Sequence, residues 1–344
     1  MCLSGCCGSQ RDEKLTKTTL LPLLSRGGAK VAPQFKDYPT MKSPKRLTLA
    51  ATAALITSAS ASVTIDWVTV GNAGNAADTT THGAVSYAYQ IGKYEVTNAQ
   101  YGAFLNAAAK TDSYGLYNSN MGDYGITRGG SSGSYTYSVS TALANRPVAY
   151  VSWFDAARFS NWMMNGQGNG STETGSYTLN GATSEIIITK NVGATIYIPS
   201  EDEWYKAAYY NGASSTYSLY PNGQNSITTA DANYGNSVDG TTDVGSYSSD
   251  PSSYGTYDQG GNLWEWTDGA INDAYRIIRG SSYGSIGAVI LSSAYDSDSE
   301  PQQERNNFGF RLASVEGFTS AVPEPSSLVL TMLASSVMLL RRKR

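Results

Sequence analysis

The sequence predicts an α+β protein that is rich in loops, with short strands and about three helices. Glycine and tyrosine are abundant, at 35 and 25 residues of 344, whereas only 15% of the residues are charged. This composition disfavours a helical bundle, because strong helix formers such as Lys and Glu are scarce. A hydrophobic share of 40% is enough for a core, so the chain is not disordered as a whole. The length allows one large domain or two ordinary ones.

Three segments carry signals for the start of a helix. The predicted N-caps are Thr97, Ser152 and Ser200. Each of the two serines is followed three residues later by an acidic residue, which is the pattern of a capping box. The first helix is expected over residues 98–109, where apolar residues recur at the spacing of one buried face. We expect the aromatic residues of all three segments to pack in the core.

Several runs between these helices have the pattern of strands. Residues 63–70 and 87–96 are predicted as two strands, and residues 186–189 and 194–198 as a hairpin closed by a short turn. Residues 112–140 are rich in Gly, Ser and Tyr and poor in aliphatic side chains. We expect this last segment to be a surface loop.

A secretory signal peptide is predicted over residues 41–61. A basic segment follows Met41, residues 47–57 are apolar, and small residues stand at the cleavage positions. The apolar stretch is too short for a transmembrane helix. We therefore expect export, with translation starting at Met41 and residues 1–40 being a mis-called upstream extension.

Two alternatives exist for the first forty residues. They could form a long basic region of the signal peptide, or carry a lipoprotein-like signal at one of three cysteines, Cys2, Cys6 and Cys7. No apolar segment precedes those cysteines, which disfavours lipidation.

The C-terminal end combines three features in order. A Pro-Glu-Pro motif at 323–325 is followed by an apolar segment over 328–340 and by the basic tail 341–344. This arrangement resembles a PEP-CTERM sorting signal. In that family an exosortase-type membrane protease cleaves near the motif and releases the protein. The resemblance therefore implies a sorting signal over residues 317–344, transient insertion of its apolar transmembrane segment, and an exosortase-type protease as a partner. The alternative is an ordinary tail anchor.

Between these two ends the chain is acidic and free of cysteine. From Ser62 to Val322 there are 11 basic and 24 acidic residues, a net charge of −13. This charge argues against nucleic acids and anionic membrane surfaces as partners. The chain has a single histidine, His82, which excludes mechanisms that need two. Because its donors are mostly carboxylates and carbonyls, calcium is favoured over zinc as a metal.

Six short blocks occur along the chain in sequence order. They are KYEVTNAQY at 93–101, RPV at 146–148 with VSWFDAA at 151–157, IPSEDEW at 198–204, GNLWEW at 261–266, IRGSS at 278–282, and FGFRL at 308–312. Together they resemble the formylglycine-generating, sulfatase-modifying factor family, whose fold is a variant of the C-type lectin fold. The resemblance implies a single compact domain over residues 62–316.

The resemblance does not extend to the family's catalytic cysteines. Members that oxidise a substrate cysteine to formylglycine use two cysteines shortly after an Arg-Gly-Gly-Ser-Trp block, and these thiolates hold copper. The matching block here is 279–283, and residues 284–290 contain no cysteine. We therefore predict no catalytic residue and no copper. A formylglycine-generating oxidoreductase acting on a sulfatase cysteine is the alternative.

The family's calcium elements match better. The resemblance implies that Asp258 and Glu265 supply carboxylates to a calcium ion and that Gly261 and Leu263 supply carbonyls. The alternative is that the two carboxylates are solvated or paired with arginine. A second family site would fall near three residues, Asn233, Tyr234 and Asp239.

Other polar segments are expected to form no site. The carboxylates of residues 201–203 fall in the first turn of a helix, where they interact favourably with the helix dipole. Residues 296–300 have the composition of a solvated acidic turn, and His82 is predicted to be a surface residue.

These observations favour an exported recognition or structural module over an enzyme. Exposed Tyr, Asn, Ser and Gly suit adaptable polar contacts with an extracellular polysaccharide or a peptide. We expect a calcium-supported, non-catalytic domain at the cell surface or in the extracellular matrix, made as a membrane-anchored precursor.

Overall fold

The computed structural model describes residues 62–184 and 188–317. The predicted signal peptide and residues 318–344, which include the apolar segment of the predicted sorting signal, lie outside the described residues. Among the residues that are described, no helix is long and apolar enough to cross a membrane.

Three α-helices begin at the predicted caps. They are α1 (Asn98–Ala108), α2 (Trp153–Met164) and α3 (Glu201–Tyr209). Each has a complete capping box, in which the cap hydroxyl and the side chain of the third helical residue accept each other's backbone N–H. The predicted helices and caps are confirmed. Two short 3-10 turns, η1 (Ser119–Gly122) and η2 (Ala288–Leu291), lie in the loops.

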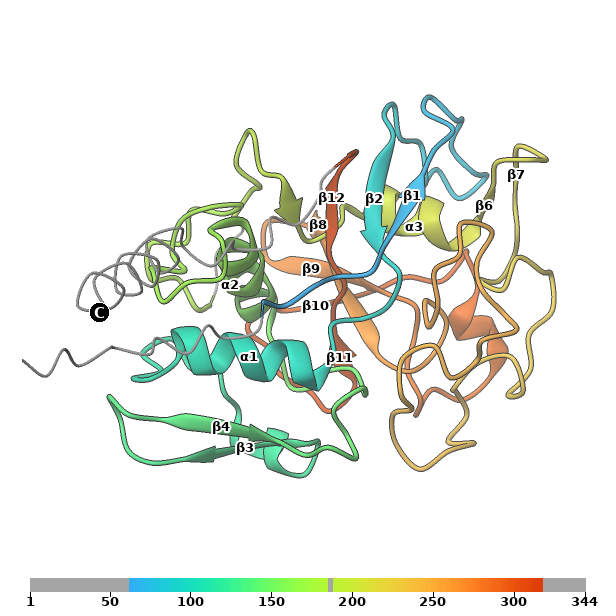
Figure 1. The fold of residues 1–344 in the computed structure, drawn as a ribbon. Coiled ribbons are helices and arrows are strands. Elements are labelled where there is room, and N and C mark those ends of the chain that lie inside the picture. Colours follow the sequence, from blue (N-terminus) through green and yellow to red (C-terminus); the bar gives the residue numbers. More distant parts are fainter. Residues whose placement is uncertain (1–61, 185–187, 318–344) are drawn as a thin grey trace, which may run out of the picture. The chain divides into compact units, whose positions relative to one another are not determined.

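Two four-stranded sheets form the centre of the domain, with α1 and α2 to one side and α3 to the other (Figure 1). The first sheet is antiparallel and has the order β1 (Trp67–Val70), β2 (Tyr89–Gly92), β12 (Ala313–Val315) and β5 (Ile196–Tyr197). Strand β12, late in the chain, is therefore inserted between two earlier strands.

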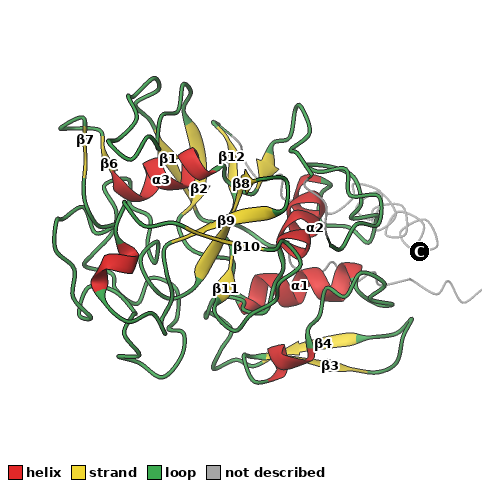
Figure 2. Cartoon of the chain, turned by 180° about the vertical axis from the view of Figure 1, so that it is seen from behind, coloured by secondary structure: helices red, strands yellow, loops and turns green. Residues whose placement is uncertain are grey.

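The second sheet contains strands from three of the sequence blocks, those at 261–266, 278–282 and 308–312. Its order is β10 (Ser297–Ser299), β9 (Tyr275–Arg279), β8 (Trp264–Ile271) and β11 (Phe308–Gly309). Strand β11 runs parallel to β8, and the other pairs are antiparallel. Between β7 and β8 the described chain is almost entirely loop, drawn green in Figure 2.

The segment expected to be a surface loop contains a hairpin, so that prediction was wrong. Strands β3 (Ile126–Gly129) and β4 (Thr136–Val139) pair antiparallel, and a second small hairpin is formed by β6 (Tyr210–Asn211) and β7 (Thr216–Tyr217). Strand β4 packs against α1, where a Cβ at Gly102 would lie 2.3 Å from Val139 Cγ2. Ile126 and Tyr137 are buried here. Tyrosine thus supplies apolar surface where aliphatic side chains are scarce.

The predicted hairpin over residues 186–198 is also corrected. Strand β5 pairs with β12, with Tyr197 opposite Ala313. In the predicted first arm, residues 188 and 189 are not in a strand, and residues 186 and 187 lie outside the described part. Both residues of β5 are buried, and their partner comes from more than a hundred residues away. The strands predicted over 63–70 and 87–96 are confirmed in part, the first over its last four residues and the second at residues 89–92.

An aromatic cluster joins α1 and α2 to the last block of the chain. The ring of Phe159 in α2 lies 5.4 Å from that of Phe104 in α1 and 5.4 Å from that of Phe310, both edge-on. Trp162 packs 5.6 Å from Phe159. Each such pair contributes about 0.5–1.5 kcal/mol beyond its buried area. The cluster confirms the predicted core role of these aromatic residues and holds residues 308–312 in place.

One cap should make the stability of the domain depend on pH. Asp155 is buried, and its carboxylate accepts hydrogen bonds from the backbone N–H and hydroxyl of Ser152, at 2.8 and 2.7 Å. Burial raises the pKa of Asp155 to about 7, and the nearby Glu304 carboxylate contributes to the rise. The folded state therefore keeps a proton that the unfolded chain has lost. The contribution of Asp155 to the free energy of unfolding should fall as pH rises from about 4 to 7, by at most about 1.4 kcal/mol per pH unit.

Asp155→Asn keeps an acceptor for the cap but no longer titrates, so it should flatten this pH dependence. Urea unfolding at pH 4.5, 5.5, 6.5 and 7.5 measures the slope for both proteins. Asp273→Asn is the matched control, because Asp273 is exposed in the turn between β8 and β9. Equal slopes for the wild type and Asp155→Asn would contradict the role given to this group.

Candidate functional site

A buried ion pair lies where three of the sequence blocks meet, those at 198–204, 261–266 and 308–312. Arg311, just after β11, donates to Glu265 of β8 through Nε and Nη2, each 2.6 Å from a different carboxylate oxygen. Trp204 of α3 donates to the same carboxylate at 2.8 Å. Both charged side chains are fully buried. Such a bidentate pair is stable in the interior only because its remaining polar atoms are also bonded.

The guanidinium of Arg311 also satisfies backbone groups from two other segments. It donates to the carbonyl oxygen of Gly92 at the end of β2, at 3.0 Å, and to that of Tyr257, at 2.8 Å. Arg311 therefore connects both sheets to the loop that precedes β8. The next residue back in the chain, Phe310, packs on Phe159 in the aromatic core and so helps to hold Arg311 in place.

Two more carboxyl groups lie near this pair. Glu95 is buried and accepts from the side chain of Asn262 at 2.8 Å and from the backbone N–H of Leu263 at 3.1 Å. Burial raises the pKa of Glu95 well above its usual range, and the charges of Asp258 and Glu265 raise it further. The raised pKa favours the protonated form of Glu95, which reduces the repulsion between its carboxyl group and those of Asp258 and Glu265.

Asp258, the other predicted carboxylate ligand, lies at the edge of this network. It has a left-handed backbone, with φ of 60°, and its carboxylate accepts from the N–H of Gly245 at 2.6 Å. Burial raises the pKa of Asp258 to about 6, although the Gly245 hydrogen bond and Arg311 act in the opposite direction. The Glu265 carboxylate is thus close enough to Asp258 to affect its pKa. Glu265 itself is paired with Arg311, which is the arginine pairing predicted from the sequence as the alternative to calcium binding.

The two sets of predicted ligands meet at Gly261. Its φ is +88°, and a Cβ at this position would lie 2.2 Å from the carbonyl oxygen of Asn233, so only glycine fits. The N–H of Asn262 donates to that same carbonyl at 2.9 Å. The side-chain oxygen Oδ1 of Asn233 is buried and accepts no hydrogen bond from the described residues. An unpaired buried acceptor of this kind suits a hard cation.

The remaining predicted ligands, Tyr234, Asp239 and Leu263, contact other groups than Asn233. The hydroxyl of Tyr234 donates to the carbonyl oxygen of Ile227 at 3.3 Å. Asp239 is exposed and lines a pocket instead. Leu263 is buried, and its N–H is engaged by Glu95.

The pocket that Asp239 lines has a volume of about 270 Å³, and we name it the tyrosine pocket. Residues that line it include Asp123, Tyr124, Arg146, Asp239, Thr241 and Tyr283. The hydroxyls of Tyr124 and Tyr283 are 3.4 Å apart, and Asn306 donates to the Tyr283 hydroxyl at 2.9 Å. Burial raises the pKa of the Tyr283 hydroxyl, as does its bond to Tyr124, so the Tyr283 phenol stays protonated and can donate.

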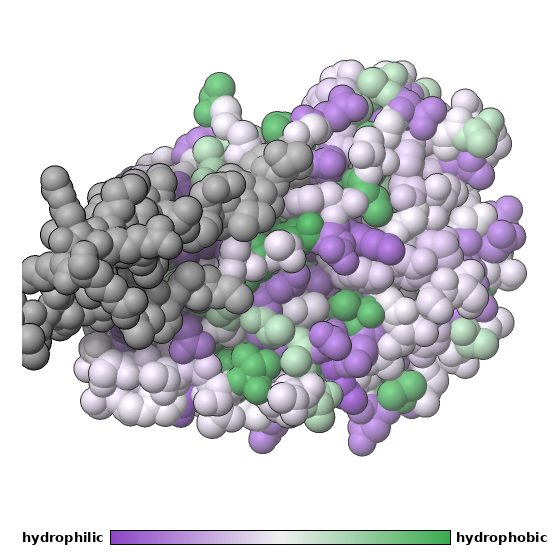
Figure 3. Space-filling model, viewed as in Figure 1, coloured by the Kyte–Doolittle hydropathy of each residue, from purple (hydrophilic) through white to green (hydrophobic). Residues whose placement is uncertain are grey.

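Tyr283 is positioned by the block that would precede the catalytic cysteines. Its N–H donates to the carbonyl oxygen of Asn262 at 2.9 Å, and its own carbonyl accepts from Asn236 at 2.8 Å. The following loop exposes Ile286 and Val289, 80% and 66% accessible. On the face drawn in Figure 3, apolar residues are scattered among polar ones and form no single large patch over the visible described part.

Comparison with known proteins shows which protein family this chain belongs to. The family described as "Sulfatase-modifying factor enzyme 1-like domain" matches residues 52–315. The chain belongs to this family. Two solved structures support the same fold for the sulfatase-modifying factor-like domain. CarF is 25% identical, with a TM-score of 0.52 over 73% of this chain and 98% of that one. Treponema denticola variable protein 1 is 21% identical, with a TM-score of 0.52 over 74% and 97%. The predicted α+β fold, a variant of the C-type lectin fold, is thereby confirmed.

The sulfatase-modifying factor-like domain also has relatives named hercynine oxygenase. The protein of Mycolicibacterium thermoresistibile is 24% identical over 269 residues, 69% of this chain and 53% of that protein. The protein of Mycobacterium tuberculosis is 24% identical over 256 residues, 66% and 52% respectively. This chain therefore spans about half the length of these curated relatives.

Sequence reasoning missed the tyrosine pocket of this domain. Arg146 and Tyr283 stood in or beside recognised blocks, but Tyr124 lies in the segment expected to be a plain loop. The available signal was composition, since 25 tyrosines against 7 phenylalanines indicate that many aromatic rings keep a hydroxyl for polar contacts.

The ion pair should dominate the stability of the site. Arg311→Met leaves the Glu265 carboxylate buried without its cation, so we expect a loss of about 3–5 kcal/mol in urea unfolding. The double variant Arg311→Met/Glu265→Leu should lose less than the sum of its single variants, because no uncompensated charge remains. Arg128→Met is the control, since the Arg128 side chain is partly exposed and Asp112 keeps the N–H of Leu116 as a donor, so this change should cost clearly less than Arg311→Met. An Arg311→Met loss no larger than this control would contradict the assignment.

Proposed function

We propose that this domain is an exported, non-catalytic recognition module that binds a neutral oligosaccharide of an extracellular polysaccharide in the tyrosine pocket. The observation that supports this best is the lining of the pocket. Two half-buried tyrosine rings offer apolar faces, and their hydroxyls, Arg146 and Asp123 offer donors and acceptors. Pockets for small polar ligands combine apolar walls with a few placed polar groups in this way.

A neutral glycan fits this pocket better than a charged one. Arg146 is opposed by Asp123 and Asp239, so the lining carries both signs. The residues between 62 and 322 have a net charge of −13, which disfavours an anionic ligand. A peptide, the other ligand class expected from the sequence, becomes an outcome of the binding test.

The residues of the chain do not support the family's oxidative chemistry. Oxidation of a substrate cysteine would need two copper-holding thiolates, and no cysteine lies between residues 62 and 344. The relatives named hercynine oxygenase suggest another oxidative reaction. A non-haem iron centre of two histidines and one carboxylate cannot be built from the single His82 of this chain. Recognition therefore remains the function that the residues support best.

Calcium is part of the proposal, as a structural ion. The buried and unpaired Oδ1 of Asn233 supports a cation beside this residue, and the half-buried Asp258, which lines one pocket together with Ala232, offers a second oxygen donor nearby. Glu265 is the weaker candidate, because Arg311 and Trp204 already engage its carboxylate. When bound, calcium would neutralise acidic charge and tie the irregular loop before β8 to its neighbours.

Binding of neutral oligosaccharides tests the tyrosine pocket. We expect one or more glucose- or mannose-based oligosaccharides of four to six sugars to bind, as measured by isothermal titration calorimetry. Tyr283→Ala should weaken that binding at least about tenfold, because it removes a ring face and a donor, a loss of about 1.4 kcal/mol. Tyr275→Ala is the control, since Tyr275 is exposed on β9 outside the pocket. Binding of only peptides, or equal binding by Tyr283→Ala and the wild type, would contradict the proposal.

Calcium should raise the melting temperature of the metal-free protein. At a hundredfold excess over Kd, calcium would add about 2.7 kcal/mol, which corresponds to roughly 5–10 °C for a domain of this size. Asn233→Ala and Asp258→Asn should each reduce this rise, whereas Asn169→Ala, at an exposed residue, should not. Identical calorimetric transitions in calcium and in EDTA would contradict the calcium assignment.

A further inference from the structure

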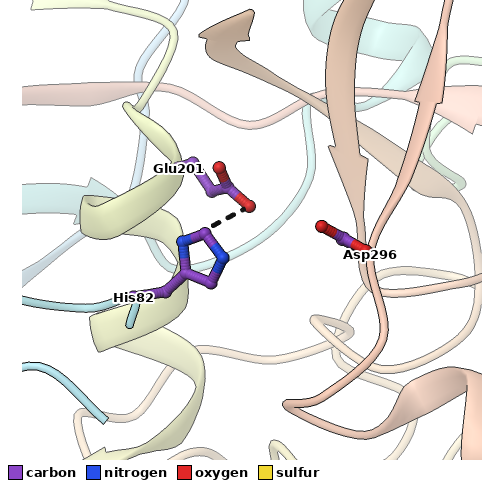
Figure 4. Close-up of side chains that lie close together, drawn as sticks. All are labelled: His82, Glu201 and Asp296. Carbon is purple, nitrogen blue, oxygen red and sulfur yellow. Dashed lines mark ion pairs between the residues drawn. The ribbon is translucent and has the colours of Figure 1, made fainter. Parts of the chain in front are cut away.

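A group of three potential metal ligands lies on elements that the tyrosine pocket does not use. His82 stands in the turn before β2, Glu201 is the first residue of α3, and Asp296 directly precedes β10. One ligand atom from each lies within 4.8 Å of the other two. In Figure 4 His82 and Glu201 lie side by side, and Asp296 points toward them from the opposite side. We name these three residues the His82 cluster.

The surroundings hold two of the ligands in place. The N–H of Gly83 donates to the Asp202 carboxylate at 2.8 Å, which fixes the turn of His82 against the start of α3. The imidazole of His82 also packs against the ring of Tyr205, with centroids 5.7 Å apart. A ligand whose orientation is fixed before the metal arrives binds at a lower entropic cost.

Arg279 orients the carboxylate of Glu201. Its Nε donates to Glu201 Oε1 at 2.9 Å, and its Nη2 donates to the same oxygen. A further bond from Arg279 to the carbonyl oxygen of Tyr295, at 2.9 Å, fixes the chain next to Asp296. Both bonds to Glu201 reach Oε1, the oxygen that also lies 3.8 Å from His82 Nδ1. Carboxylates that bind metals are commonly held by such outer hydrogen bonds.

The charges around the His82 cluster favour a divalent cation. Glu201, Asp202 and Asp296 carry three negative charges, and Arg279 compensates one of them. The Nδ1 atom of His82 is 3.8 Å from Glu201 Oε1 and 4.0 Å from Asp202 Oδ1. Two uncompensated negative charges therefore remain in a small volume. A divalent ion would neutralise them and shorten the present contacts to coordination distances.

We propose that His82, Glu201 and Asp296 bind a divalent transition-metal ion of the zinc class. An imidazole nitrogen with two carboxylate oxygens matches zinc better than calcium, which prefers oxygen donors alone. Three protein ligands leave at least one position of a tetrahedral zinc ion open. Because His82 and Glu201 are half-buried and Asp296 is exposed, water can reach that position. The site is independent of the calcium region, with which it shares no residue.

Zinc binding to the tag-free full chain, stripped of metal with EDTA, tests this site; Cys2, Cys6 and Cys7 are first replaced by serine, because their thiolates would themselves bind zinc. Isothermal titration with zinc chloride should show one site per chain. His82→Gln and Asp296→Asn should each weaken it at least about tenfold, and Asp298→Asn should not. Asp298 is the matched control because it is an exposed acid two residues from Asp296, on β10. Glu201 is left unchanged because its replacement would also leave the buried Arg279 guanidinium without its carboxylate partner.

A spectroscopic readout separates coordination from a general effect on folding. His82 is the only histidine, so the imidazole nitrogens of the ¹⁵N-labelled protein give one set of NMR signals. Addition of zinc should shift the Nδ1 or Nε2 signal of His82 in proportion to occupancy. Absence of zinc binding, binding that His82→Gln leaves unchanged, or several weak sites shared by all variants would each overturn the proposal.

Discussion

The buried Arg311–Glu265 pair is the interaction on which the rest of the domain depends. It joins β8 to the segment between β11 and β12, and the indole of Trp204 brings α3 to the same carboxylate. Two residues after Arg311 the chain enters the first sheet as β12, between β2 and β5. Both sheets and one helix therefore converge on a single ion pair. Because neither charge reaches water, the arrangement has little tolerance for displacement.

This rigid centre allows the functional surface to be irregular. The long loop before β8 and the loop after β9 are tied to the centre by backbone bonds at Asn262 and Tyr283 and by the close packing of Gly261 on Asn233. Loops carried in this way can change their side chains without loss of the scaffold. In this chain the window after β9 exposes Ile286 and Val289 where family members that make formylglycine carry cysteines. Tyrosines from two loops form a pocket beside it.

The sequence predicted the helix starts well, but it missed the β3–β4 hairpin and the distant partner of β5. Each helix began at its predicted cap, because a capping box depends on four neighbouring residues. The partner of β5 could not be read locally, because it is Ala313 of β12. Family resemblance located Asp258 and Glu265, but only the structure shows that Arg311 engages Glu265. The tyrosine pocket and the His82 cluster went unpredicted for the same reason: each is assembled from segments far apart in the chain.

The central claim is that this member of the family keeps the scaffold and recognises a ligand without oxidising it. The most direct measurement is to incubate the purified chain with a cysteine-containing sulfatase peptide, oxygen, a thiol reductant and copper, and to analyse the peptide by mass spectrometry. The account predicts no formylglycine above a protein-free blank, because no cysteine after residue 7 can hold the copper. Formylglycine that increases with protein concentration and time would contradict it.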